Sequence, residues 1–191
     1  REKVLLMRLL DHVIGHQNII SHMISSYRRG QKGQVQLFVG PSGIGKRQVA
    51  LGLAQALLCE QGDEACGRCG SCLRLAKQYH EGLLQIAPDG QQIKVEQAHQ
   101  ILEFLHLRAI SKARVIIIDQ AHAMNLHAAN SLLKILEEPP AETYFFLIAP
   151  TPRHVLPTLR SRSQLMHFAP VSFEKMKEVL HDISDSSLRA S

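Results

Sequence analysis

Apolar residues recur along the chain with two periods that alternate. Some segments place them three or four residues apart, as on one face of an amphipathic helix, and others place them in short runs typical of buried strands. The helical period covers positions 19–27, 49–57, 95–105 and 126–136, and the strand-like runs cover positions 34–39, 83–86, 115–118, 144–149 and 165–168. This alternation predicts an α/β protein.

The pattern changes twice in ways that indicate subdivisions. A cysteine-rich stretch at 59–72 interrupts the alternation and forms a module of its own. A further amphipathic helix is predicted from Ser172, just beyond Ala169-Pro170, and Ser-rich residues follow it. We therefore expect a first domain over residues 1–169 and the beginning of a smaller helical domain over residues 170–191.

Composition narrows the class of protein. Apolar residues make up 45% and charged residues 20% of the 191 positions, which excludes wholesale disorder. No apolar run approaches the ~20 residues that a membrane-spanning helix needs, and the N-terminus lacks the pattern of a signal peptide, so we expect a cytosolic protein. The formal net charge of +5 is compatible with a nucleic-acid complex without indicating one.

A glycine-rich turn joins the first predicted strand to the next helix. It reads Gly-Pro-Ser-Gly-Ile-Gly-Lys over positions 40–46, the G-x-x-x-x-G-K pattern of a phosphate-binding loop. Gly40, Gly43 and Gly45 let backbone N–H groups point at an anion, and Lys46 can reach its terminal phosphates. The next position normally carries the hydroxyl that binds Mg²⁺, and here it is Arg47. Three readings stay open: nucleotide bound with poorly held Mg²⁺, phosphates contacted by Arg47 itself, or an empty site.

The buried run at 115–118 ends in a carboxylate. Asp119 follows it directly, as expected of the strand that lies beside the phosphate-binding loop and delivers an acidic group to the nucleotide. Enzymes that hydrolyse ATP at such a site usually have Glu at the next position, where it activates water. This chain has Gln120, which can hold a water by hydrogen bonds but cannot accept its proton. Together with Arg47, it predicts a fold whose hydrolytic chemistry has been lost.

All four cysteines of the chain fall within 14 positions. The spacing Cys59-x6-Cys66-x2-Cys69-x2-Cys72 supplies four thiolates suited to tetrahedral Zn²⁺. Because no ligand position is left for water, such a zinc ion is structural. Disulfides and an iron–sulfur cluster are the alternatives.

Three stretches become recognisable in combination. They are the phosphate-binding loop followed by four cysteines, NLHAANSLLKILEEPP at 125–140, and VLPTLRSR at 155–162. Together they resemble the bacterial clamp-loader subunits of DNA polymerase III, from Val13-Ile14-Gly15-His16 to about position 170. The resemblance implies an α/β AAA+ domain with a parallel sheet flanked by helices, with Val13 and Ile14 at its nucleotide site, and then a helical lid. It also implies a C-terminal collar that holds a five-subunit ring together, and we expect this chain to end inside the lid.

Within this family, the departures indicate one type of subunit. The gamma and tau motor subunits keep an intact phosphate-binding loop and an Asp-Glu pair, whereas delta-prime subunits commonly do not hydrolyse ATP. Arg47 and Gln120 therefore favour the delta-prime type, and so does Ala149-Pro150, where motor subunits carry a polar sensor. The alternatives are an active gamma/tau-type ATPase and an AAA+ subunit for helicase loading or recombination.

Arg162 matches the arginine that the family presents across a subunit interface. An arginine finger of this kind stabilises charge at a neighbour's γ-phosphate. The resemblance implies gamma/tau and delta subunits as partners, and it implies action on the sliding clamp and primed DNA within the DNA polymerase III holoenzyme, a DNA-directed DNA polymerase. Whether ATP or ADP occupies this chain's own loop stays open, and Gln120 and Arg47 argue against well-bound Mg²⁺.

Overall fold

The computed structural model describes residues 7–31, 33–62, 64–108 and 110–171. Five strands form one sheet in the order β2-β3-β4-β1-β5, and every neighbouring pair is parallel. The strands are β1 (Gln34–Val39), β2 (Leu83–Ile86), β3 (Arg114–Ile118), β4 (Thr143–Ala149) and β5 (Gln164–His167).

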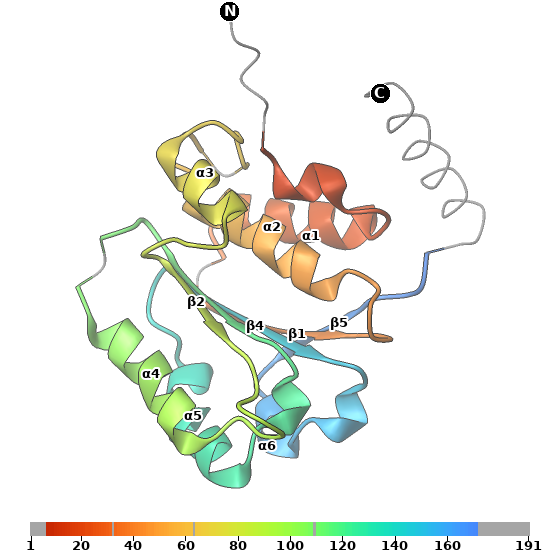
Figure 1. Ribbon diagram of the computed structural model, residues 1–191, viewed down its shortest axis with the longest axis vertical. Helices are drawn as coiled ribbons and strands as arrows, with labels where there is room; N and C mark the ends of the chain where they lie inside the picture. The colour runs from red at the N-terminus through yellow and green to blue at the C-terminus, as the bar shows by residue number, and fades with distance from the viewer. Residues whose placement is uncertain (1–6, 32, 63, 109, 172–191) are drawn as a thin grey trace, which may run out of the picture.

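Helices cover both faces of the sheet (Figure 1). On one face lie α1 (Gln17–Arg28), α2 (Lys46–Leu58) and α3 (Gly70–Ala76), and on the other lie α4 (Val95–His106), α5 (Leu126–Glu137) and α6 (Pro157–Arg160). Three 3-10 turns complete the order: η1 (Leu9–His12), η2 (Ala121–Ala123) and η3 (Pro152–His154).

Alternating side chains of the central strands build two separate cores. In β1, Leu37 and Val39 pack with the α4–α5 layer, while Phe38 packs with α1 and α2. In β3, Ile116 and Ile118 join the first core, and Val115 and Ile117 join the second. Because both faces are covered, the strands are apolar along almost their whole length, which is why they read as continuous runs in the sequence.

Parallel pairing places the ends of the central strands at one edge. Val39 pairs with Ala149, and Ile118 pairs with Leu147. The loops that follow β1, β3 and β4 therefore meet at the carboxyl edge, where open α/β sheets bind their ligands. The helix after β3 begins sharply because the Asn125 side chain accepts a hydrogen bond from the Ala128 N–H at 2.8 Å.

The predicted α/β fold with a parallel sheet is confirmed, and all five predicted strands and four predicted helices are present. Helix α3, within the cysteine module, was not predicted. The helix expected from Ser172 lies outside the described residues, and the boundary near Ala169 stays a prediction. Across the described part of the chain, no helix has the length and apolar character needed to cross a membrane.

Candidate functional site

A cavity of about 450 Å³ opens at the carboxyl edge of the sheet, between the phosphate-binding loop and the end of β3. Its lining comes from three loops far apart in the sequence, because β1, β3 and β4 end side by side. The lining residues are Ser42, Gly43, Gly45, Lys46, Arg47, Gln48, Asp119, Gln120, His122, Ile148, Ala149 and Pro150. The structure thus brings together six of the predicted nucleotide-site residues.

The loop itself is shaped by glycine. Gly40 has φ +152°, and a Cβ added there would lie 2.3 Å from the Phe168 carbonyl oxygen, so only glycine fits beneath the residue that follows β5. Lys46 is buried, and its Nζ donates to the carbonyl oxygens of Gly40 at 2.6 Å and Pro41 at 2.7 Å. Burial lowers the pKa of Lys46, against the opposing charge of Asp119. The lysine is thus held inside the loop that would surround a phosphate.

Arg47 lies where a hydrolysing site has its Mg²⁺-binding hydroxyl. Its Nη2 donates to Gln78 Oε1 and Gln85 Oε1, both at 2.8 Å, and its Nε is 4.0 Å from Asp119 Oδ2. Two glutamine side chains from outside the phosphate-binding loop therefore hold the guanidinium toward β2 and Asp119. In this arrangement a positive charge faces the carboxylate that would otherwise help to bind the metal.

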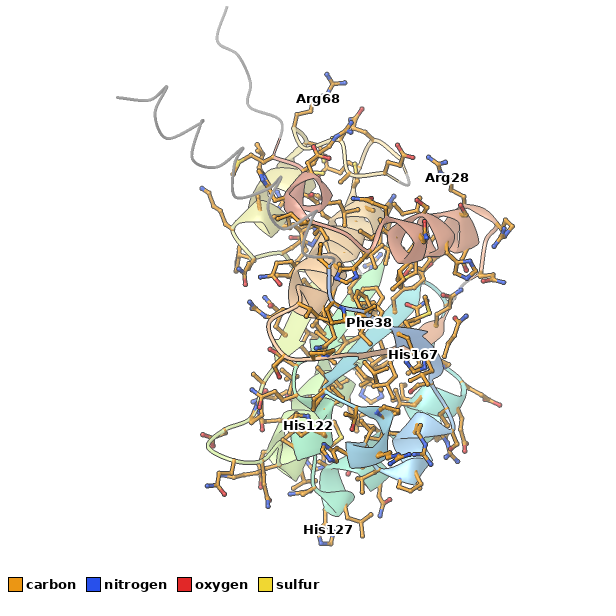
Figure 2. The ribbon with its side chains drawn as sticks, turned by 90° about the vertical axis from the view of Figure 1, so that its right-hand side faces the viewer. Arg28, Phe38, Arg68, His122, His127 and His167 are labelled. Carbon is orange, nitrogen blue, oxygen red and sulfur yellow. The ribbon has the colours of Figure 1, made fainter. Side chains whose placement is uncertain are left out.

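The residues after β3 depart from the hydrolytic pattern in a second way. Gln120 has φ +51°, a left-handed conformation that is uncommon for a residue other than glycine, and its N–H donates to Asp119 Oδ1 at 2.9 Å. His122 also lines the cavity, and burial together with the neighbouring His154 lowers its pKa. No described residue gives its buried Nδ1 a hydrogen bond, and Figure 2 shows its position relative to the sheet. An imidazole that the sequence did not assign to this site thus joins the cavity wall.

The four cysteines converge into one cluster beside α2 and α3. Their sulfur atoms lie within 4.8 Å of one another, with Cys59–Cys69 at 4.0 Å and Cys66–Cys72 at 3.9 Å. Four ligands at ~2.3 Å around a tetrahedral ion are separated by about 3.8 Å, so the residues fit a single metal ion. All four thiols are free, which removes the disulfide alternative.

Backbone groups already favour thiolate in part of this cluster. The Arg68 N–H, more than any other group, lowers the pKa of Cys66 to about 6. Burial acts in the opposite direction on Cys72 and raises its pKa. Each of the Cys66, Cys69 and Cys72 N–H groups donates to the sulfur of the preceding cysteine, at 3.3–3.4 Å. In Figure 2 Arg68 points away from the body of the protein, at the tip of this module.

Arg162 lies far from the cavity, at the opposite edge of the sheet. It precedes β5, whose first residue Gln164 pairs with Gln36 of β1, and the phosphate-binding loop begins four positions further along β1 at Gly40. At ~3.3 Å per residue, these four positions span roughly 13 Å, and Arg162 lies further back still. Its guanidinium contacts Glu137 and the Thr158 carbonyl oxygen within its own chain.

Comparison with known proteins decides the family. The family model described as "DNA polymerase III, delta subunit" matches residues 15–172. The chain is 38% identical over 139 residues to subunit delta' of DNA polymerase III from Pseudomonas aeruginosa, and the match covers 70% of this chain and 42% of that relative. It is 35% identical over 153 residues to subunit delta' from Escherichia coli, and that match covers 78% of this chain and 46% of the relative. The chain belongs to the DNA polymerase III delta-prime clamp-loader family.

Tau subunits of DNA polymerase III are also similar in sequence, and solved structures share the fold. Subunit tau from Salmonella typhimurium is 30% identical over 174 residues, covering 90% of this chain and 27% of that protein. A gamma subunit-related protein from Thermotoga maritima superimposes with a TM-score of 0.58 at 22% identity, covering 79% and 47% of the two chains. A RuvB structure from the same organism gives 0.63 at 16% identity, covering 94% and 54%, and supports the AAA+ fold. The chain spans about half the length of its delta-prime relatives or less.

Three predicted nucleotide-site residues of this delta-prime family member are not in the cavity lining: Gly40, which shapes the loop from beneath, and Val13 and Ile14. Val13 is buried in the core between the sheet and α1–α2, and Ile14 is 39% exposed. Their neighbour His16 makes the contact instead, with its Nε2 2.9 Å from the Ile44 carbonyl oxygen of the phosphate-binding loop. The Val-Ile-Gly-His stretch therefore does reach the loop, through a residue that the sequence did not single out.

Proposed function

We propose that this chain is the AAA+ domain of a delta-prime-type clamp-loader subunit that does not hydrolyse ATP itself and supplies Arg162 to the ATP site of a neighbouring subunit. The observation that carries the proposal is the contrast between the two ends of the sheet. The chain's own nucleotide cavity, at the carboxyl edge of the sheet, has Arg47 and Gln120 where catalysis needs a metal ligand and a base. Arg162 lies at the opposite edge of the sheet, near the surface of the protein.

The cavity supports nucleotide binding better than it supports hydrolysis. Lys46 and the glycine backbone can hold phosphates, but the guanidinium of Arg47 repels a divalent cation near Asp119. Gln120 can hold a water molecule and cannot take its proton. This combination favours a site that binds nucleotide weakly, without well-held Mg²⁺.

Arg162 is suited to act on another subunit. It is separated from its own cavity by the length of β1, so its charge cannot reach a phosphate bound there. Its side chain is 27% exposed, which leaves the guanidinium accessible to an adjacent subunit. A planar guanidinium with several donors matches phosphate oxygens and stabilises the charge that develops on them during transfer.

The partners follow from the family. We infer that gamma/tau and delta subunits form the ring with this one, and that the ring acts on the sliding clamp and on primed DNA. The cysteine cluster would hold a structural zinc ion, because it offers four sulfur ligands and no open position. Its ligands are Cys59, Cys66, Cys69 and Cys72.

A reconstituted clamp loader tests the proposal. The complete subunit carrying Arg162→Ala should assemble with its partners, yet lower DNA-stimulated ATP hydrolysis by at least the share of one site, because a finger contributes about 10³–10⁵-fold at the site it serves. Arg160→Ala is the matched control, since Arg160 is exposed and, among the described residues, its guanidinium donates a hydrogen bond to the Pro152 carbonyl oxygen alone, at 3.4 Å. Equal ATPase activity in the two variants contradicts the role of Arg162.

A further inference from the structure

The guanidinium of Arg162 is bound within its own subunit. Its Nε donates to Glu137 Oε1 at 2.8 Å, and its Nη2 donates to the same oxygen. Its Nη1 donates to the Thr158 carbonyl oxygen at 3.0 Å. Each of the three guanidinium nitrogens therefore has a partner in the same chain, and one carboxylate oxygen accepts from two of them.

Glu137 is fixed in place by the helix that carries it. It is the last residue of α5, and Leu132 and Leu136 of that helix are buried against the sheet. A carboxylate at the C-terminus of a helix is disfavoured by the helix dipole, so the helix does not explain an acidic residue at this position. Arg162 supplies the positive charge that offsets this cost, and the pair joins α5 to the segment before β5.

The adjacent residue, Glu138, carries the same negative charge in a different setting. Glu138 is exposed, and no described residue forms a hydrogen bond or ion pair with its carboxylate. Two adjacent glutamates thus differ in a single respect that concerns Arg162, namely contact with its guanidinium. The pair provides an internal comparison for any effect of local negative charge.

We propose that Glu137 positions Arg162 by holding its guanidinium within its own subunit until the phosphates of a neighbour's ATP displace the carboxylate. The proposal rests on the proposed function of Arg162 as an arginine finger. The Glu137 side chain is 51% exposed, and exposed ion pairs shift an equilibrium by only about 1.5- to 5-fold. A nucleoside triphosphate carries more negative charge than a single carboxylate, so it can take the guanidinium over. Glu137 therefore keeps Arg162 from engaging other anions and lowers its engagement with a neighbouring nucleotide by the same modest factor.

The test uses the complete subunit in the reconstituted clamp loader. Steady-state ATP hydrolysis without DNA is measured for Glu137→Ala, Glu137→Gln and the control Glu138→Ala. Releasing Arg162 should raise kcat/KM about 1.5- to 5-fold in Glu137→Ala, with a smaller rise in Glu137→Gln, whose neutral amide still accepts a hydrogen bond. Glu138→Ala should match the wild type. In an Arg162→Ala background, Glu137→Ala should change nothing, because its effect acts through the arginine.

The possible outcomes separate failure of the holding role of Glu137 from failure of the finger role of Arg162. If Arg162→Ala lowers hydrolysis but Glu137→Ala equals Glu138→Ala, the holding role is wrong and the finger stands. A fall in kcat/KM with Glu137→Ala also overturns the holding role. If Glu137→Ala raises hydrolysis equally with and without Arg162, its effect does not pass through the guanidinium, and the proposal fails. If Arg162→Ala itself has no effect, the proposed function fails as well.

Discussion

The clearest quantitative consequence concerns Arg47 and divalent metal. An Mg²⁺ ion bound to Asp119 would lie on the order of 4 Å from the Arg47 guanidinium, given the 4.0 Å separation of Nε and Oδ2. The Arg47 side chain is 43% exposed, so we use the dielectric constant of water. Two unit charges at 4 Å then interact by about 1 kcal/mol, and a divalent ion is repelled by about 2 kcal/mol. That energy corresponds to about 30-fold weaker metal binding.

The assay is a nucleotide titration with and without Mg²⁺ on the complete, zinc-loaded subunit. Arg47→Ala should make Mg²⁺ tighten ADP binding about 30-fold more than it does in the wild type, because the repelling charge is gone. Arg47→Thr should show at least as large an effect, since it also adds a hydroxyl ligand. Arg47→Lys keeps the charge and should behave like the wild type. Mg²⁺ tightening binding in the wild type as strongly as in Arg47→Thr refutes the reasoning.

Three further predictions concern stability and metal content. Gly40→Ala should lower the free energy of urea unfolding by about 3 kcal/mol, because it adds backbone strain and overlap with the Phe168 carbonyl. Gly43 has open space around it, so Gly43→Ala should lower the free energy of unfolding by about 1 kcal/mol, and equal losses in the two variants contradict the packing. Burial lowers the pKa of His80 in the folded state, so the contribution of His80 to stability is complete above the unfolded-state pKa of about 6.5 and is lost as pH falls toward the lowered folded-state pKa. The free energy of unfolding, measured at a series of pH values, should show this loss in the wild type relative to His80→Gln, and parallel pH dependences of the two proteins contradict it. Metal analysis should find about one zinc per chain, and Cys72→Ser should lower both zinc content and Tm, with a chelator removing the Tm difference; absence of zinc overturns the assignment.

The elements that the sequence predicted best are those with unbroken apolar periodicity. The strand at 115–118 is buried between two helical layers, and the helix at 126–136 buries one face against the sheet, so burial imposed one clear pattern on each. The phosphate-binding loop could be placed because its glycines and lysine are close in sequence and their order carries the geometry. Cysteine spacing predicted the cluster for the same reason.

Features that depend on distant pairing could not be read from the sequence. The partners of Arg47, Gln78 and Gln85, lie 31 and 38 residues away and belong to no motif. The contact of Glu137 with Arg162 spans 25 residues and follows from the position of β5 beside β1. The order of strands in the sheet is likewise a property of tertiary packing rather than of any one segment.

Helix α3 was missed for a local reason. It is only seven residues long, and a cysteine takes the capping position that Ser, Asp or Asn usually occupies: Cys69 accepts a hydrogen bond from the Cys72 N–H through its sulfur. With two cluster cysteines and a glycine among Cys69 and the helix residues, no apolar stripe marks a helix.

The central claim is that this subunit contributes to ATP hydrolysis without performing it. Its most direct test is the steady-state ATPase rate of the complete, zinc-loaded subunit alone with Mg²⁺, measured beside Lys46→Ala. The account predicts a rate no greater than that of Lys46→Ala, because Arg47 and Gln120 replace the groups that hydrolysis needs. Turnover that Lys46→Ala abolishes would contradict it.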